Sequence, residues 1–173
     1  MARNSINPLN EEKVLNQNDF IVSKTDTKGI ITYCNQIFME MAEYEENELI
    51  GKNHNLVRHP DMPKAAFKLA WDLIQSENEF FGFVKNIRKS GGYYWVFTNI
   101  TADYDNKGNI IGYTSVRRKP NRSAIDAVEP IYKQMVSIEQ SSGINQSVEF
   151  LMNFLKDNNT SYDELIISLQ GDM

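Results

Sequence analysis

Residues 80–118 read FFGFVKNIRKSGGYYWVFTNITADYDNKGNIIGYTSVRR, and this stretch decides the fold class. The β-branched and aromatic residues that favour strands are concentrated in three runs, 80–88, 93–101 and 109–118. Between the runs, residues 89–92 (KSGG) and 105–108 (DNKG) have the composition of tight turns. The stretch therefore predicts three antiparallel strands in a meander.

The residues before this meander predict two more strands and a set of helices. Two strand-like runs, 20–24 and 30–34, flank a glycine-containing turn and predict a hairpin. Short helices are expected between Asn35 and Gly51, and a longer helix over 65–74, where apolar residues recur at helical spacing. The order of these elements predicts an α+β domain, with a five-stranded antiparallel sheet and helices on one face. This is the arrangement of a PAS domain.

The chain divides into three predicted segments: an N-terminal cap over residues 1–18, a sensory domain over 19–119 and a helical C-terminal segment over 120–173. A short helix is expected at Asn7-Pro8, because proline is tolerated in the first turn of a helix. The C-terminal segment predicts a helix interrupted or kinked at Pro130, a second helix, and a third that begins at the capping box Ser161-x-x-Glu164.

Composition and motifs exclude several classes of function. Hydrophobic residues make up 41% of the chain and charged residues 24%, as in folded proteins, and the single cysteine, Cys34, excludes an internal disulfide and a multi-cysteine zinc site. Residues 1–120 hold 15 basic and 15 acidic side chains and residues 121–173 hold 3 and 8, so no basic face for nucleic acid is expected. No apolar run approaches the ~20 residues of a membrane span, and the N-terminus is polar. We expect a cytoplasmic protein that does not insert into membranes, and without any catalytic motif we expect no enzyme and no metal site.

Residues 53–63, NHNLVRHPDMP, closely resemble the signature of the flavin-binding PAS domain of bacterial aerotaxis receptors. The similarity extends in the same order over roughly residues 20–133. The resemblance implies non-covalent binding of FAD, whose oxidation state is read out as a change in swimming behaviour. Those receptors also carry membrane and methyl-accepting segments, and neither is expected in this chain. We therefore expect a stand-alone energy-taxis sensor that signals to a separate membrane-bound transducer of the methyl-accepting type.

Asparagine amides suit the polar edge of a flavin ring, because each provides a donor and an acceptor in one group. Asn35, Asn86 and Asn99 are the candidates for this contact. For Asn35 the alternative is a hydrogen bond to its own backbone, which is the commoner role of asparagine in a turn.

Arg58, His59 and Asp61 lie in a proline-bounded loop and form the best candidate for cofactor binding. The guanidinium can pair with a phosphate oxygen, and the carboxylate can hold the arginine in position. The alternative is an ordinary surface ion pair. A haem held by one histidine is a further alternative, although the charged neighbours of His59 suit a polar contact better.

Three aromatic residues are candidates for the walls of a ring-binding site. Trp71 on the predicted long helix and Trp95 on the predicted fourth strand can stack on a ring, and core packing is the alternative for both. Phe80 stands where the family often has tryptophan, which implies a weaker flavin affinity or a changed potential.

The competing function is that of a PAS interaction scaffold without a redox cofactor, or a sensor of haem or another small ligand. The acidic C-terminal helices can dock on the sensory domain, on a second copy or on a transducer. The N-terminal cap can also pair two copies in a homodimer.

Overall fold

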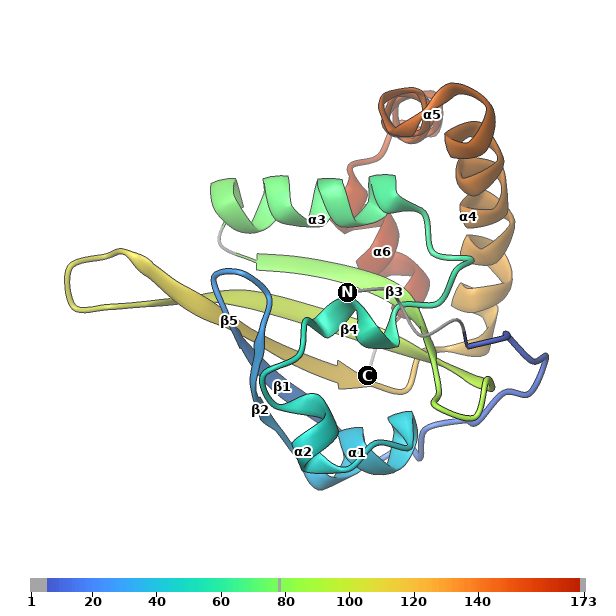
Figure 1. Cartoon of the computed structure of the whole chain (residues 1–173). Coiled ribbons are helices and arrows are strands. Elements are labelled where there is room, and N and C mark those ends of the chain that lie inside the picture. Colours follow the sequence, from blue (N-terminus) through green and yellow to red (C-terminus); the bar gives the residue numbers. More distant parts are fainter. Residues whose placement is uncertain (1–5, 78, 172–173) are drawn as a thin grey trace.

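The computed structural model describes residues 6–77 and 79–171, and its centre is one five-stranded sheet (Figure 1). The strands are β1 (Ile21–Asp26), β2 (Ile31–Cys34), β3 (Glu79–Ile87), β4 (Tyr93–Tyr104) and β5 (Ile110–Arg118). Their order across the sheet is β2-β1-β5-β4-β3, and all neighbours are antiparallel. The predicted hairpin and meander are confirmed, because the turn residues lie where the strands reverse.

Strand register decides which side chains share a face of the sheet. Asn86 pairs with Tyr94, and Thr98 pairs with Arg117. Because successive side chains in a strand point to opposite faces, Asn86, Thr98 and Arg117 lie on one face, whereas Lys85 and Trp95 lie on the other. The first of these faces carries the cavity described below.

Four short or medium helices cover the cavity face. They are α1 (Gln36–Ala42), α2 (Glu46–Leu49), the 3-10 helix η1 (His54–Val57) and α3 (Lys64–Glu77). Their apolar residues divide between two clusters: α1, α2 and η1 share one with Tyr94 and Val96 of β4, and α3 shares the other with Phe80 of β3 and with residues of α4, α5 and α6. The helices predicted between Asn35 and Gly51 and after Pro63 are confirmed, whereas no element was predicted at the position of η1.

The C-terminal segment folds back onto the sheet and α3 as three helices, α4 (Arg122–Ser142), α5 (Ile144–Asp157) and α6 (Tyr162–Gln170). In Figure 1, α4 stands at one end of the sheet, α5 lies at the level above α3, and α6 lies behind β3. The capping box before α6 is confirmed, since Ser161 Oγ accepts from Glu164 N and Glu164 Oε2 accepts from Ser161 N. Of the two alternatives predicted at Pro130, an interruption or a kink, the interruption is wrong, because α4 continues as one helix through that residue.

The short helix expected at Asn7-Pro8 is also wrong, because residues 6–18 contain no helix. The segment instead pairs with the β3–β4 hairpin: Leu9 N donates to Gly91 O, Lys13 N donates to Tyr93 O, and Tyr93 N donates to Glu11 O. Backbone groups used in this way are not available for helical hydrogen bonds. Leu15 is buried in the cluster formed by α1 and β4, which fixes the segment to the domain.

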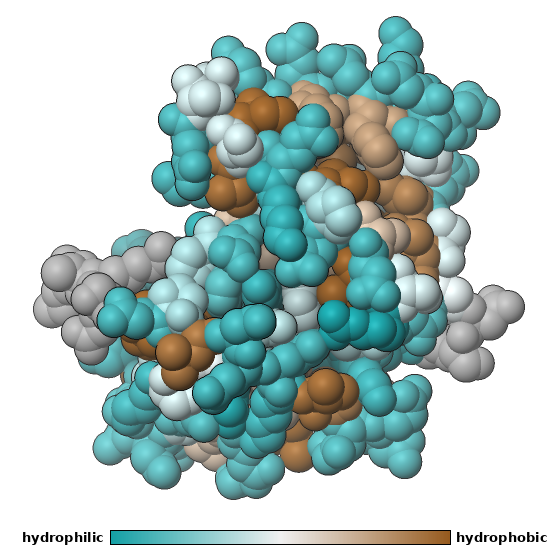
Figure 2. Space-filling view, turned by 90° about the vertical axis from the view of Figure 1, so that its right-hand side faces the viewer, coloured by the Kyte–Doolittle hydropathy of each residue, from teal (hydrophilic) through white to brown (hydrophobic). Residues whose placement is uncertain are grey.

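Figure 2 shows the side of the molecule on which α4 lies. Hydrophilic residues cover most of this side, and hydrophobic residues gather mainly in its upper half, at the level of α3 and α5. Within residues 6–77 and 79–171, no helix combines the length and apolar character needed to cross a bilayer.

Candidate binding cavity

A cavity of about 440 Å³ lies between the sheet, η1, α3 and the turn that joins β1 to β2. Its volume is in the range of pockets that hold small molecules and cofactors. The side chains that line it come from all these elements: Ser23, Thr25, Thr27, Lys28, Asn53, His54, Asn55, Arg58, Phe67, Trp71, Gln75, Val84, Asn86, Thr98, Ile100, Tyr113, Ser115 and Arg117.

The inner end of the cavity is polar and buried. Ser23, Asn86, Thr98, Ser115 and Arg117 are each less than a tenth exposed. Thr98 Oγ1 and Arg117 Nη1 have no hydrogen-bond partner among the described residues. Buried polar atoms are nearly always paired, so these two atoms mark a place where a polar ligand group fits.

Arg117 is held at this inner end by neutral groups. Its Nε donates to Ser115 Oγ at 3.0 Å, and its Nη2 donates to Ser23 Oγ and lies 2.8 Å from His54 Nε2. Among the described residues no carboxylate is within ion-pair distance of its guanidinium. Burial lowers the pKa of Arg117 to about 10, so the side chain is still a cation at neutral pH.

His54 is neutral in this environment. Burial and the neighbouring charge of Arg117 lower the pKa of His54 to about 3. Its ring stacks on Phe38 with centroids 5.5 Å apart. A neutral imidazole can accept a hydrogen bond from Arg117 and so orient the guanidinium.

The outer end of the cavity is more exposed and also carries cations. Lys28 and Asn53 are exposed there, and Arg58 lies with its guanidinium carbon 3.8 Å from the centroid of the Phe67 ring. Three cationic side chains, Lys28, Arg58 and Arg117, line the cavity, and no described carboxylate does. In a protein of net charge −5 this favours an anionic ligand.

The lining fits a flavin nucleotide in three respects. The inner polar end offers donors and acceptors for the polar edge of the ring, and the cations can pair with phosphate groups. Apolar walls for a flat ring come from Phe67, Val84, Ile100, Trp71 and Tyr113. The rings of Trp71 and Tyr113 meet edge to face, with their centroids 4.9 Å apart.

Three of the nine residues singled out in the sequence line the cavity: Arg58, Asn86 and Trp71. Arg58 and Asn86 also form a backbone bridge, so η1 and β3 meet at the cavity wall. Trp71 is 39% exposed and lies at the outer end.

Asn35 is placed away from the cavity. Its Oδ1 accepts from Phe38 N and Val22 N, and its Nδ2 donates to Phe20 O. The amide is thus occupied in capping α1 and joining it to the start of β1, which is the backbone role given above as the alternative.

Asn99 and Trp95 lie on the opposite face of the sheet, because each alternates along β4 with the residues that face the cavity. Asn99 Nδ2 donates to Glu79 Oε2 at 3.2 Å, and the Trp95 ring stacks on Tyr132 of α4. Phe80 is also absent from the lining, since its ring stacks on Tyr162 of α6.

His59 and Asp61 do not line the cavity either, although they follow Arg58 closely in sequence. Asp61 Oδ2 accepts from Lys85 Nζ at 2.7 Å, and His59 Nδ1 accepts from Asp61 N at 3.1 Å. Asp61 therefore holds a lysine and not, as expected, the arginine of the cavity wall. His59 is also poorly placed to ligate a haem inside the cavity.

Sequence reasoning missed His54 as a cavity residue, along with Ser23, Thr98, Ser115 and Arg117. Only a weak signal was present: Ser115 and Arg117 are polar residues at alternate positions of a strand, but Thr114 and Arg118 next to them are polar as well. The strand order that brings β1 beside β5 was needed to add Ser23.

Comparisons with known proteins agree with this geometry. A model of the PAS fold matches residues 31–117, which is half of the chain. The chain belongs to the PAS family. It is 40% identical over 128 residues to the aerotaxis receptor of Escherichia coli (strain K12), an alignment that covers 74% of this chain and 25% of the receptor. The chain thus spans about a quarter of the length of that relative.

Solved structures of PAS domains share the fold at low sequence identity. A light-oxygen-voltage domain studied with a flavin analogue superposes with a TM-score of 0.56 at 22% identity, covering 66% of this chain and 86% of that one. The PAS domain of a Colwellia psychrerythraea protein superposes with a TM-score of 0.55 at 17% identity, covering 58% and 85%. The predicted PAS fold and its relation to aerotaxis receptors are confirmed.

Proposed function

We propose that this PAS domain binds FAD in the cavity and acts as a redox or energy sensor in bacterial taxis. The observation that carries the proposal is the inner end of the cavity, where buried Thr98 Oγ1 and Arg117 Nη1 have no partner, and no carboxylate lines the walls, among the residues that the structure describes. The similarity to an aerotaxis receptor and to a domain studied with a flavin analogue supports the choice of ligand.

Each group of lining residues has a distinct task in this proposal. Bound flavin supplies a centre that can be reduced and reoxidised. Asn86, Thr98 and Ser115 provide hydrogen bonds to the polar edge of the ring, and Arg117 provides a fixed cation next to it. Arg58 and Lys28 pair with the phosphates nearer the outer end.

Signalling requires that the two oxidation states favour different packings of the protein, since a ligand shifts a conformational equilibrium only through unequal affinity. The receiving partner in this proposal is a membrane-bound transducer of the methyl-accepting type, contacted in the cytoplasm. The protein acts by binding this partner and not by turning over a substrate. The C-terminal segment, with 3 basic and 8 acidic residues over 121–173, is the surface offered to a basic region of that transducer.

The test is the visible absorption spectrum of the purified protein, followed by release and chromatographic identification of the chromophore. Flavin bands at about 370 and 450 nm, with FAD released, are expected. A Soret band would show that the bound ligand is haem and not a flavin. A colourless protein that also fails to take up added FAD would contradict the proposal and favour the scaffold function.

A further inference from the structure

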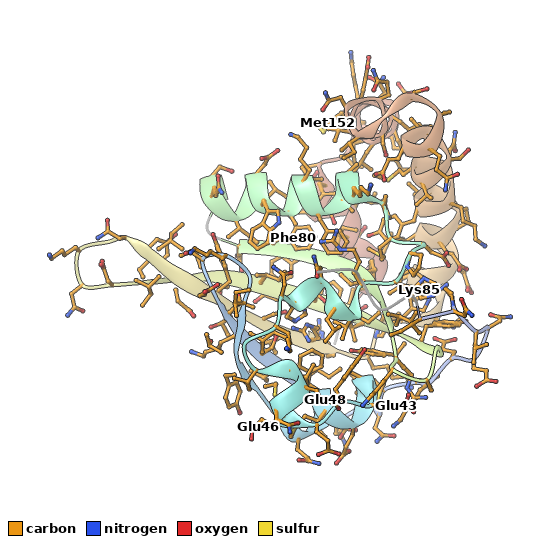
Figure 3. All side chains as sticks on the ribbon, in the orientation of Figure 1. Glu43, Glu46, Glu48, Phe80, Lys85 and Met152 are labelled. Atoms are coloured by element: carbon orange, nitrogen blue, oxygen red, sulfur yellow. The ribbon has the colours of Figure 1, made fainter. Side chains whose placement is uncertain are left out.

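Trp71 and Tyr113 form an aromatic pair in the wall of the cavity. Trp71 belongs to the row Phe67, Trp71 and Gln75 of α3, whose members are four residues apart and all line the cavity. Tyr113 lines it from β5, and the centroids of the two rings are 4.9 Å apart with their planes at 62°. Figure 3 shows side chains that reach from α3 into the space above the sheet. A flat ligand in this cavity therefore has the pair as part of its wall.

The two members of the pair differ in their access to solvent. Tyr113 is 8% exposed, whereas Trp71 is 39% exposed. The other tryptophan of the chain, Trp95, is 4% exposed, lies on the opposite face of the sheet and stacks on Tyr132. Trp71 is thus the tryptophan that lines the cavity and also reaches the surrounding solution.

The chemistry of the lining favours Trp71 over Tyr113 as a one-electron donor. Indole and phenol are among the side chains that most readily lose one electron, and a flavin that has absorbed blue light is a strong one-electron oxidant. A phenol keeps its proton at neutral pH and needs a base to accept that proton when the electron leaves. No carboxylate among the described residues lines the cavity, and the imidazole of His54 lies at the inner end beside Arg117. Tyr113 is therefore a positioning residue, which holds the indole by edge contact.

The charges of the cavity favour the same direction of electron transfer. Lys28, Arg58 and Arg117 line the cavity, so these cations stabilise an electron that arrives there. They also repel the positive charge left on the indole, and water stabilises that charge where Trp71 is exposed. A reductant in solution can reach the same exposed ring. The oxidised indole can thus be reduced from outside before the electron returns to it.

We propose that Trp71 is the electron donor of a light-driven reduction at this site, which makes the protein responsive to blue light as well as to redox conditions. One electron leaves the Trp71 indole and enters the excited flavin ring. A thiolate in solution then gives one electron to the oxidised indole, and two of the resulting thiyl radicals join as a disulfide. Each disulfide accounts for two electrons delivered to bound flavin, and Trp71 is restored. This role rests on the proposed function, since it needs a bound flavin.

The first experiment illuminates the FAD-loaded full chain at about 450 nm, without oxygen and with glutathione as the thiol, and follows the loss of the flavin absorption band. Wild type is compared with Trp71→Phe, which keeps an aromatic wall, and with the matched control Trp95→Phe. Trp71→Phe is expected to slow the reduction at least about fivefold, and Trp95→Phe to stay within about twofold of wild type. Equal rates in wild type and Trp71→Phe, or a slow reduction in Trp95→Phe alone, would overturn the proposal.

The second experiment measures the fluorescence lifetime of bound FAD in the same proteins and in Tyr113→Phe. An electron donor in the cavity wall shortens this lifetime, so Trp71→Phe is expected to lengthen it. Tyr113→Phe keeps the ring that holds the indole and is expected to stay within about twofold of wild type in lifetime and in rate of reduction. A lifetime unchanged in Trp71→Phe and lengthened in Tyr113→Phe would assign the electron to the phenol and overturn the role of Trp71.

The two proposals fail in different ways. If the wild type binds no FAD, the proposed function is wrong, and the role of Trp71 is wrong with it. If the wild type binds FAD but Trp71→Phe matches it in lifetime and in rate of light-driven reduction, the proposed function stands and only the role of Trp71 is wrong.

Discussion

Arg117 of β5 and Lys85 of β3 are both buried cations of the same sheet, on opposite faces. Their partners differ in charge. Arg117 is 2% exposed, and within the described part of the chain its hydrogen-bond partners are neutral and its Nη1 has no partner. Lys85 is 6% exposed, with a carboxylate at 2.7 Å, a second at 3.8 Å and the Tyr93 ring over its amine.

This difference in partners indicates that Arg117 is a ligand-binding group and that Lys85 is a structural group. A buried charge without a counter-charge costs folding free energy, and is tolerated where a ligand completes its environment. A buried charge whose counter-charges belong to the same chain holds segments together. Arg117 thus belongs to the cavity, and Lys85 to the contact between the cavity wall and α4.

The largest expected effect is the loss of ligand binding in Arg117→Met. Removing a charged hydrogen-bond donor from a buried site is expected to raise the Kd for FAD by about 10- to 150-fold. The free energy of unfolding without ligand should change by less than about 2 kcal/mol, because relief from burying the charge offsets the lost hydrogen bonds. Titration with FAD and urea unfolding measure both. Wild-type affinity in this variant would show that Arg117 does not face the ligand.

Lys85→Met should have a larger effect on the free energy of unfolding than Arg117→Met has. We expect the free energy of unfolding to fall by about 1 to 3 kcal/mol, because two carboxylates lose their shared partner, although Asp61 is half exposed and can rehydrate. Urea unfolding of the full chain gives this value. A variant as stable as wild type would mean that the ion pairs of Lys85 with Asp61 and Glu129 contribute nothing to the fold.

A smaller effect is expected from Thr98→Val, which replaces the unpaired hydroxyl by a methyl group of similar size. The chain without ligand should be equally stable or up to about 1 kcal/mol more stable, since an unsatisfied buried group is removed. The Kd for FAD should rise by about 3- to 10-fold. Thr101→Val on the opposite face of β4 is the matched control. A loss of stability in Thr98→Val without loss of affinity would assign the hydroxyl to the fold.

The two histidines make the stability of the protein depend on pH. Burial lowers the pKa of His59 to about 4 and that of His54, beside Arg117, to about 3. Between about pH 6.5 and pH 4 the unfolded chain therefore binds protons that the folded chain does not, so stability falls as the pH falls through this window. His59→Asn, whose amide oxygen can still accept from Asp61 N, should lose part of this slope. Urea unfolding from pH 4 to 7 measures it, and an unchanged slope would contradict the shift.

The sequence predicted the fold well because each part of it depends on local patterns. Strand runs, turns at 89–92 and 105–108, the stripe of α3 and the capping box of α6 all act over a few residues. The N-terminal segment was mispredicted because its partner is the distant backbone of Tyr93. No prediction was made for η1, because a single 3-10 turn has no periodicity.

The cavity was harder to predict, since it is built from residues brought together by strand order. The predicted residues Arg58, Asn86 and Trp71 line the cavity, whereas Asp61 contacts Lys85 and Asn99 lies on the other face of the sheet. Arg117 was overlooked because its role depends on which strand lies beside β5. The alternation of side chains along one strand shows which residues share a face of the sheet. The order of the strands is also needed to show which of them line the same cavity.

The most direct test of the cavity as a flavin site is a comparison of backbone and side-chain NMR spectra of the full chain with and without FAD. The account predicts the largest shifts at Ser23, Asn86, Thr98, Ser115 and Arg117, and smaller shifts at residues that do not line the cavity. Shifts confined to exposed residues outside the cavity, or no shifts at saturating FAD, would contradict it.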